Sequence, residues 1–306
     1  MRRGGRRFLV RGNHCSAWFG AFLAAALISI LLGASSASAA TRAGKAARGP
    51  DVRSTSVLVI DGSNSTVVFE RKPDVVAPIA SITKLMTALV VLDGKQPLDE
   101  IVEIAADDKN RGKGAFSRLN VGTKLSRSDL LRLALMSSEN RAARALGRSY
   151  PGGEAAFVRT MNAKAKSLGM TQSHFADPSG LDTDNVSSAR DLAKLVIAAG
   201  RSETIRDYST SKDHEVRIGR SMVEFHNTNS LVKNPAWNIT VQKTGYISEA
   251  GECLVMQALI EERPVIIVLL NSFGKYTRVA DAKRIRQWME AQHPRSLARA
   301  GTGKRS

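Results

Sequence analysis

Residues 81–92 read Ser-Ile-Thr-Lys-Leu-Met-Thr-Ala-Leu-Val-Val-Leu, a polar first turn that runs into a stretch apolar on nearly every side. A helix that is apolar all round is buried in a protein core, whereas a surface helix is apolar on one side only. A spacing of three residues places Ser81 and Lys84 on one face of such a helix. The sequence therefore predicts a buried helix that begins at Ser81, with a hydroxyl beside an amine.

Burial would change the chemistry of Lys84. Desolvation disfavours the charged ammonium and lowers the pKa of a lysine from its ordinary value of about 10.4. A neutral amine three residues from Ser81 could then take the proton of the hydroxyl and make the serine a nucleophile. The helix N-terminus would also offer backbone N–H groups to an oxyanion.

The same serine-lysine spacing recurs elsewhere, so the spacing alone is weak evidence. The pair Ser209/Lys212 lies in a polar segment, and the pair Ser230/Lys233 is followed by Asn234-Pro235. The pair Ser272/Lys275 has Gly274 between its two members. None of these contexts favours a buried helix.

Outward from residues 81–92, the patterning predicts an α+β fold. A hairpin is expected from β-branched runs at residues 56–60 and 66–69 around a turn, and strands at residues 239–241, 253–256 and 265–270. Helical periodicity dominates residues 126–200 and returns at residues 279–290. We expect a helical subdomain and one central antiparallel sheet built from the N- and C-terminal segments, with helices on its faces.

The N-terminal segment has the features of a secretory signal. An arginine-rich start precedes an apolar run at residues 17–32 and the small residues Ala37-Ser38-Ala39. We expect a signal peptide at residues 1–39, the alternative being an uncleaved anchor. A flexible leader at residues 40–52, a catalytic domain at residues 53–293 and a basic disordered tail at residues 294–306 would follow.

Charge and cysteine content narrow the possible partners and cofactors. The formal net charge is +17, and five arginines precede the apolar run, so residues 41–306 carry +12. A basic surface attracts any polyanion, but no zinc-finger or RNA-binding signature accompanies it. After the signal only Cys253 remains, which excludes an internal disulfide, and no His/Cys cluster has metal-ligand spacing. We expect no nucleic-acid partner, metal or cofactor.

Two further polar elements follow Ser81 in the chain. Ser138-Glu139-Asn140 supplies a hydroxyl and an amide, and Lys243-Thr244-Gly245 leads into a predicted strand. Each has a plain structural explanation, because a serine here could cap the next helix and a lysine could blunt a sheet edge. Together and in this order, they are the trio found in β-lactamases and penicillin-binding proteins.

The sequence resembles the low-molecular-mass penicillin-binding proteins, which are serine-type D-Ala-D-Ala carboxypeptidases and endopeptidases of peptidase family S11. The resemblance extends from Ser56 to Trp288. The Ser-Ser-Glu-Asn motif and the lack of room for a second C-terminal domain are most like the endopeptidase subgroup. The stretches that carry it are Pro-Ile-Ala-Ser-Ile-Thr-Lys-Leu-Met-Thr at 78–87, Met-Ser-Ser-Glu-Asn-Arg-Ala-Ala at 136–143, Lys-Thr-Gly-Tyr at 243–246, Ala250-Gly251 and Cys253-Leu254.

The resemblance implies a DD-peptidase/β-lactamase-like fold and a role for each catalytic residue. Ser81 would be the acyl-ester nucleophile and Lys84 its general base. Ser138 would relay a proton to the leaving amine, and Asn140 would position the substrate amide.

The resemblance also implies substrate-binding residues on the third element, Lys243 to Tyr246. Lys243 and Thr244 would hold a terminal carboxylate, Gly245 would belong to the same surface, and the backbone N–H groups of Ser81 and Tyr246 would form the oxyanion hole. Arg190 and Arg278 are candidates either for anion binding or for structural salt bridges. The implied partners are peptidoglycan stem peptides and, as covalent inhibitors, β-lactam antibiotics. The implied location is the periplasm.

Several rival functions can be weighed from the residues. A Ser-His-Asp hydrolase would need a Gly-x-Ser-x-Gly elbow, which is absent. A β-lactamase would need a group that activates water, and residues 176–182 contain no glutamate. A silent peptidoglycan-binding protein would have lost a motif residue, and none is lost. The sequence leaves open whether the enzyme is an endopeptidase or a strict carboxypeptidase.

Overall fold

The structure is a computed structural model that describes residues 49–109 and 117–292. The expected signal peptide at residues 1–39 and the expected tail at residues 294–306 lie outside the described residues. The described residues from Pro50 onward belong to one compact unit.

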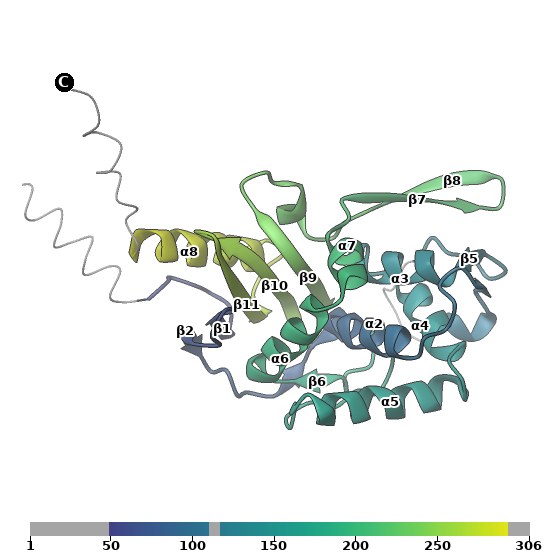
Figure 1. Cartoon of the computed structure of the whole chain (residues 1–306), viewed down its shortest axis with the longest axis horizontal. Helices are drawn as coiled ribbons and strands as arrows, with labels where there is room; N and C mark the ends of the chain where they lie inside the picture. The colour runs from purple at the N-terminus through teal and green to yellow at the C-terminus, as the bar shows by residue number, and fades with distance from the viewer. Residues whose placement is uncertain (1–48, 110–116, 293–306) are drawn as a thin grey trace, which may run out of the picture. The chain divides into compact units, whose positions relative to one another are not determined.

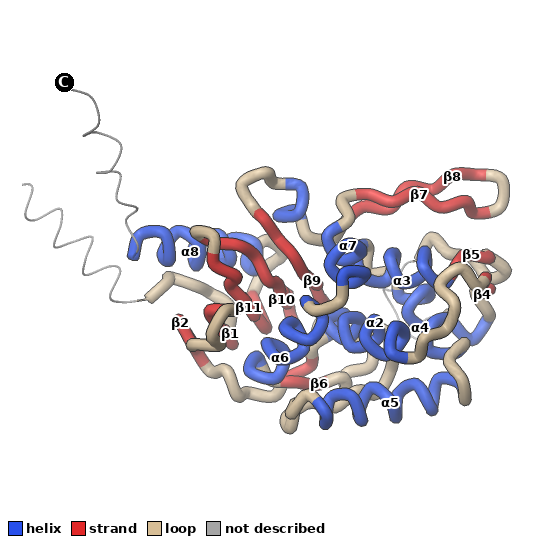
Figure 2. The backbone as a smooth tube through the Cα atoms, viewed as in Figure 1, coloured by secondary structure: helices blue, strands red, loops and turns tan. Residues whose placement is uncertain are grey.

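A five-stranded antiparallel sheet lies at the centre of this unit (Figures 1 and 2), with the strand order β2-β1-β11-β10-β9. The strands are β1 (Ser56–Asp61), β2 (Val67–Arg71), β9 (Asn238–Ile247), β10 (Gly251–Ile260) and β11 (Arg263–Ser272). The first strand pairs with the last, β1 with β11. The prediction of one sheet shared by the N- and C-terminal segments is therefore confirmed.

Successive residues of the strands enter two separate hydrophobic cores, because side chains alternate between the faces of a sheet. On one face, Val57 and Leu254 pack with residues of α8 (Thr277–Gln292), including Ile285. On the other face, Leu58 and Val255 join a larger core formed with the remaining helices. The predicted α+β layout, with helices covering both faces of the sheet, is confirmed.

The larger core is built around α2 (Lys84–Asp93), eight of whose ten residues are buried. This helix packs against α3 (Arg127–Met136), α4 (Asn140–Arg148), α5 (Gly153–Ser167) and α6 (Ala189–Gly200). The apolar run in the sequence thus marks a central helix, as predicted. Its start differs by one turn, because Ser81 lies in the 3-10 helix η1 (Ala80–Thr83) that leads into α2.

Helices α3 to α6 lie within residues 126–200, the range predicted for a helical subdomain, but they do not all cover the same layer. Helix α6 packs on strands β1, β9, β10 and β11, so it covers the sheet. Helix α7 (Glu203–Thr210) extends the helical region beyond residue 200 and packs on β9 and α3. Helical periodicity identified the elements, but it could not tell which layer each helix would cover.

Short strands complete the fold. They are β3 (Ala77–Pro78) with β6 (Val186–Ser187), β4 (Ile101–Glu103) with β5 (Lys124–Ser126), and β7 (Asp213–Ile218) with β8 (Ser221–His226). The sequence did not predict the β7–β8 hairpin, which extends to the upper right in Figure 1. Two more 3-10 helices are η2 (Ala106–Asp108) and η3 (Ser230–Lys233).

A buried carboxylate ties the start of the domain to its last helix. Asp281 on α8 is 0% exposed, and its Oδ2 accepts hydrogen bonds from the backbone N–H groups of Arg53 (2.9 Å) and Ser54 (2.7 Å). The Ser54 hydroxyl donates to the same oxygen at 2.6 Å. Arg284 neutralises the carboxylate at 2.7 Å. This Asp281 clamp fixes the segment that enters β1.

Candidate active site

A cleft of about 1050 Å³ opens where η1, the end of β9 and the N-terminus of α4 meet. All three sequence motifs contribute to this region. The motif residues that line the cleft are Ser81, Ser138, Asn140, Thr244, Gly245 and Tyr246, while Lys84 and Lys243 are buried beside them.

Ser81 and Lys84 form the centre of the site. The Lys84 Nζ lies 2.7 Å from Ser81 Oγ, 2.7 Å from Asn140 Oδ1 and 2.6 Å from the carbonyl oxygen of Ser179. A neutral amine has two N–H donors and one lone pair, so it can donate to Asn140 and Ser179 and accept the Ser81 proton. After that transfer the ammonium still has a partner for each N–H. Neither protonation state leaves Lys84 with an unpaired polar group.

Burial lowers the pKa of Lys84 to about 7, while the negative charges of Asp177 and Glu139 partly oppose the shift. The side chain is fully buried. A lysine with this pKa is neutral in a large fraction of molecules near pH 7, so it can act as a base. The structure thus has the desolvated amine that the apolar helix predicted.

Ser138 lies on the turn between α3 and α4 and faces the third motif. Its φ of 61° is in the left-handed region, which is unusual for a residue with a side chain. Its Oγ accepts a hydrogen bond from Lys243 Nζ at 3.0 Å. The next residue, Glu139, caps α4 through Arg141 N and also binds the Ser117 hydroxyl. Burial raises the pKa of the Glu139 carboxyl.

Lys243 and Thr244 lie on β9, the edge strand of the sheet. Lys243 is fully buried, and burial, followed by the charges of Lys84 and Arg278, lowers its pKa well below the ordinary value. Its Nζ also donates to the Thr244 carbonyl at 2.8 Å. The motif lies within β9, whereas the sequence predicted that it would precede a strand.

Gly245 allows β9 to approach the serine closely. A Cβ at this position would lie 2.9 Å from the Ile79 carbonyl oxygen and 3.2 Å from the Ser81 nitrogen. Any other residue would push β9 away from η1. The absence of a side chain therefore keeps the backbone around Ser81 N and the Gly245–Tyr246 segment close together.

The loop at residues 176–183 holds the other side of Lys84 in place. Asp177 accepts hydrogen bonds from Ser179 N at 2.8 Å and from Asn185 Nδ2 at 3.1 Å. Gly180 adopts a φ of +80°, and a Cβ there would lie 2.0 Å from the Ala80 carbonyl oxygen. The Asp177 carboxylate, which lines the cleft, is thus held by hydrogen bonds from this loop and from Asn185.

Residues 43–274 match the D-alanyl-D-alanine carboxypeptidase family, peptidase S11. The chain belongs to this family. It is 50% identical to a D-alanyl-D-alanine endopeptidase of Pseudomonas aeruginosa, over 78% of each chain. It is also 46% identical to a D-alanyl-D-alanine endopeptidase of Escherichia coli, over 82% of each chain.

Solved structures of a DD-transpeptidase and a D-alanyl-D-alanine carboxypeptidase share the fold. A DD-transpeptidase of Streptomyces superposes with a TM-score of 0.73 at 29% identity, over 78% of this chain and 98% of that one. A D-alanyl-D-alanine carboxypeptidase of Mycobacterium tuberculosis gives a TM-score of 0.73 at 27% identity, over 80% and 94%. The chain is a serine-type D-Ala-D-Ala peptidase with the penicillin-binding fold.

The two arginines considered for anion binding have different surroundings in this S11 peptidase. Arg278 lines the cleft, where its guanidinium donates to the Gly245 carbonyl at 2.7 Å and pairs with Glu252. Arg190 pairs instead with Asp74 at 2.7 Å and with Glu70 at 3.1 Å, and it does not line the cleft. The structure brings Arg278 to the site and leaves Arg190 in a surface ion-pair cluster.

Sequence reasoning missed the contribution of Thr228, which follows the β7–β8 hairpin. Its side chain lines the cleft, and its backbone N–H donates to the Met136 carbonyl at 2.9 Å. Asn229 and Asn227 continue this polar segment, and Asn227 Nδ2 donates to Ser209 O at 3.0 Å. No motif marks Thr228, because only the folded hairpin brings it beside β9.

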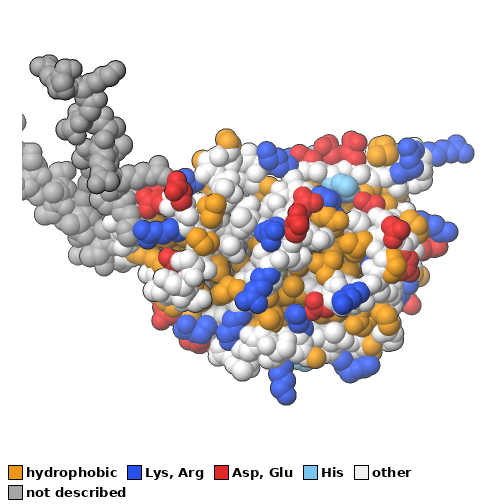
Figure 3. All heavy atoms as spheres, viewed as in Figure 1, with side chains coloured by type: hydrophobic (Ala, Val, Ile, Leu, Met, Phe, Trp, Pro, Cys, Tyr) orange, Lys and Arg blue, Asp and Glu red, His pale blue; other side chains and the backbone are white. Residues whose placement is uncertain are grey.

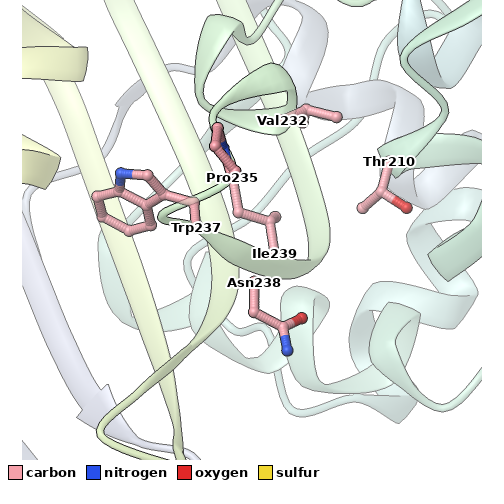
Figure 4. A pocket seen from close by; sticks show the side chains of 6 residues that line it. All are labelled: Thr210, Val232, Pro235, Trp237, Asn238 and Ile239. Carbon is pink, nitrogen blue, oxygen red and sulfur yellow. The ribbon is translucent and has the colours of Figure 1, made fainter.

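A smaller pocket of about 410 Å³ lies at the start of β9, outside the motif residues (Figure 4). Trp237 forms one wall, and Arg286 lies over its ring at 5.1 Å. The cleft at Ser81 is therefore the larger of the two and the one that contains the reactive groups.

The described surface carries charges of both signs. In the face shown in Figure 3, lysine and arginine side chains lie among acidic and apolar ones rather than in one continuous patch. Among residues 49–109 and 117–292, no helix is long and apolar enough to cross a membrane.

Proposed function

We propose that this S11 peptidase cleaves D-Ala-containing bonds of peptidoglycan stem peptides through an acyl-enzyme on Ser81. The observation that carries the proposal is the 2.7 Å contact between Ser81 Oγ and the fully buried Lys84 amine. A hydroxyl in contact with a neutral base is an activated nucleophile.

The reaction would proceed in two steps, acylation of Ser81 and hydrolysis of the acyl-enzyme. Lys84 accepts the Ser81 proton, and Ser81 Oγ attacks the D-Ala carbonyl carbon while the backbone N–H groups of Ser81 and Tyr246 bind the oxyanion. The C–N bond then breaks, the leaving amine takes the proton of the Ser138 hydroxyl, and the Lys84 ammonium gives its proton back to Ser138, which leaves an ester on Ser81 and a neutral Lys84. In the second step Lys84 takes a proton from water, the water oxygen attacks the ester carbonyl, and the C–O bond breaks. The free acid leaves, and the proton returns from Lys84 to Ser81 Oγ.

The third motif would select substrates with a free carboxylate on the leaving residue. Lys243 is 3.0 Å from Ser138, so an anion bound by Lys243 and Thr244 places the leaving amine beside the Ser138 hydroxyl. Asn140 would hold the amide of the acyl residue, because its Oδ1 is fixed by Lys84 at 2.7 Å. The same arrangement accepts a β-lactam, which carries a carboxylate beside a reactive carbonyl.

Endopeptidase activity is the preference that we propose. The two relatives at 50% and 46% identity are D-alanyl-D-alanine endopeptidases. The Escherichia coli carboxypeptidase DacA is only 30% identical, and the match spans 61% of that protein. Free pentapeptides and cross-linked dimers both present a D-Ala carbonyl followed by a D-centre with a carboxylate, so the Lys243 motif serves either.

Chromatography of defined muropeptides distinguishes the two activities. Purified wild-type protein should convert cross-linked dimers to monomers at least as fast as it releases D-Ala from pentapeptide, and the Ser81→Ala variant should do neither. Release of D-Ala with the dimer left intact would instead identify a strict carboxypeptidase.

We also propose that the protein acts in the periplasm, with residues 1–39 removed on export and residues 53–293 forming the catalytic domain. The leader at residues 40–52 and the basic tail at residues 294–306 would flank it. N-terminal sequencing of the exported protein should begin near Ala40. Recovery of the uncleaved chain in salt-washed membranes would contradict this and support an anchor.

A further inference from the structure

A buried carboxylate separates the two cleft residues of the second motif. Ser138 Oγ lies 3.0 Å from Lys243 Nζ. Asn140 Oδ1 lies 2.7 Å from Lys84 Nζ. Both Ser138 and Asn140 line the cleft, whereas Glu139 between them does not and is only 7% exposed. The Glu139 side chain therefore faces the interior of the protein rather than the substrate.

The Glu139 side chain fastens this turn to a neighbouring segment. Its Oε1 accepts hydrogen bonds from the Ser117 hydroxyl and from Arg141 N at 3.3 Å, and the second of these caps α4. The backbone N–H of Glu139 donates to Leu133 O at 3.1 Å. The preceding Ser138 has a φ of 61°, a conformation that persists only where the surroundings hold it. Glu139 thus fixes the turn that presents the Ser138 hydroxyl.

These hydrogen bonds do not require a negative charge. Both go to Oε1, and the amide oxygen of a glutamine could accept them equally well. Burial raises the pKa of the Glu139 carboxyl, so the surroundings disfavour the charge. Lys84 and Arg141 are the cations that favour it. Arg141 directs its guanidinium to Leu119 O at 2.6 Å, so Lys84 is the cation that links this carboxylate to the reaction.

The charge of Lys84 changes during acylation. When its amine takes the Ser81 proton, an ammonium forms at a fully buried position. Desolvation disfavours that ammonium. A negative charge held nearby by the fold stabilises the ammonium and the transition state that leads to it, because it needs no reorganisation when the proton moves.

Three ionisable groups act on the Lys84 ammonium. Asp177 and Glu139 favour it, since the charge of each raises the pKa of Lys84. Lys243 opposes it, because two lysines in mutual repulsion each disfavour charge on the other. Asp177 also holds the loop at residues 176–183 together, so replacing it would disturb that loop. Glu139 is the carboxylate whose charge can be removed with less change in structure.

We propose that Glu139 is a positioning residue that fixes the Ser138 turn and supplies a buried negative charge to the Lys84 ammonium formed during acylation. It touches neither the substrate nor the reacting atoms, and it acts through Lys84 and the turn. This inference rests on the proposed function, since it concerns the base of the same acylation step.

The variant Glu139→Gln tests the charge, because it keeps an acceptor oxygen at the same distance from the backbone. The measurement is the rate of acylation by a fluorescent penicillin as a function of pH. Without the carboxylate the pKa of Lys84 should fall, so the acid limb should move to lower pH by about 0.5 to 1 pH unit. The plateau rate should also fall by roughly 3- to 10-fold, because the amine is a weaker base.

Two matched variants separate charge from geometry. Glu139→Asp keeps the charge on a shorter side chain, so its midpoint should stay near the wild-type value while its rate falls. Glu215→Gln removes the same charge from an exposed position of β7 outside the cleft, and it should change neither quantity. First-order acylation rates at saturating penicillin do not depend on the amount of folded enzyme, so partial misfolding cannot imitate a shift of the midpoint.

The outcomes distinguish failure of this inference from failure of the proposed function. A Glu139→Gln profile lowered equally at every pH, with an unchanged midpoint, would overturn the electrostatic role. Equal midpoint shifts in Glu139→Gln and Glu139→Asp would overturn it too, because geometry and not charge would then be the cause. Both results leave acylation intact. Failure of penicillin to acylate the wild-type protein at any pH would instead overturn the proposed function.

Discussion

The hydroxyl oxygens of Thr228 and Thr244 lie 2.6 Å apart, which joins the segment after the β7–β8 hairpin to the strand that carries Lys243. This contact holds the Thr244 hydroxyl in place, and when Thr228 is the donor, Thr244 keeps its own proton for a substrate carboxylate. Thr228→Val should therefore raise KM and lower kcat/KM by roughly 3- to 10-fold, the usual effect of one neutral hydrogen bond. Thr228→Ser, which keeps the hydroxyl, should restore the value. Steady-state kinetics that gave wild-type KM for the valine variant would argue against this positioning role.

A single serine should be acylated by penicillin. Intact-protein mass spectrometry should show one adduct on the wild-type chain and none on Ser81→Ala. The other serines with a lysine three residues later provide internal controls, because only Ser81 contacts its lysine at 2.7 Å. A peptide map with the adduct on Ser209, Ser230 or Ser272 would refute the assignment.

Acylation should require the neutral form of Lys84. With its pKa lowered to about 7, the amine is protonated below that pH, so the acylation rate should fall tenfold per unit below about 7 and level off above it. Stopped-flow acylation across pH 5–10 measures this profile.

Replacing Lys84 by arginine tests the base directly. A guanidinium keeps the positive charge but cannot be deprotonated in a protein, so Lys84→Arg should slow acylation by roughly 10²-fold or more. Wild-type rates in this variant would mean that Lys84 acts only through its charge.

Gly245→Ala should impair acylation without removing a catalytic group. The new Cβ would lie 2.9 Å from Ile79 O and 3.2 Å from Ser81 N, so β9 would have to move away from η1. Because the oxyanion donors would then separate, we expect a loss on the order of 10²-fold, the scale for one oxyanion-hole donor. Gly219→Ala, in the β7–β8 turn, meets no atom within 4 Å but strains a backbone φ of +60°, so it reports general destabilisation away from the cleft, and an equal loss there would point to that cause.

Much of this architecture could be predicted because the informative signals are local. Continuous runs rich in β-branched residues identified β1 and β11, and the apolar run after Ser81 identified α2. The same run predicted that Lys84 would be desolvated. The serines, lysines and glycine of the three motifs have chemical roles that follow from their residue types. The sequence could therefore predict that the motifs meet in one site before the pairing of the strands was known.

The rest depended on contacts between distant residues. Strand β7 alternates in exposure, but Val216 is its only buried residue and His214 places a polar group on the same face, so the alternation of apolar residues in the sequence is too short to indicate a strand. Arg190 resembles an anion-binding residue in the sequence, but Asp74 lies 116 positions away and occupies it at 2.7 Å. Tertiary packing decides which polar residues become paired, and local sequence patterns do not show this.

The pairing of β1 with β11 and the Asp281 clamp also govern the order in which this enzyme can mature. Ser54 and Asp281 are separated by 227 positions, so the first strand emerges from the ribosome long before its partners have been synthesised. Contacts at such separation form late, because a long loop must close first. The approach of Gly245 to Ser81 depends on the same sheet. A chain in transit therefore has a serine and a lysine but no assembled cleft, and hydrolytic activity begins only when the last strands and α8 have arrived.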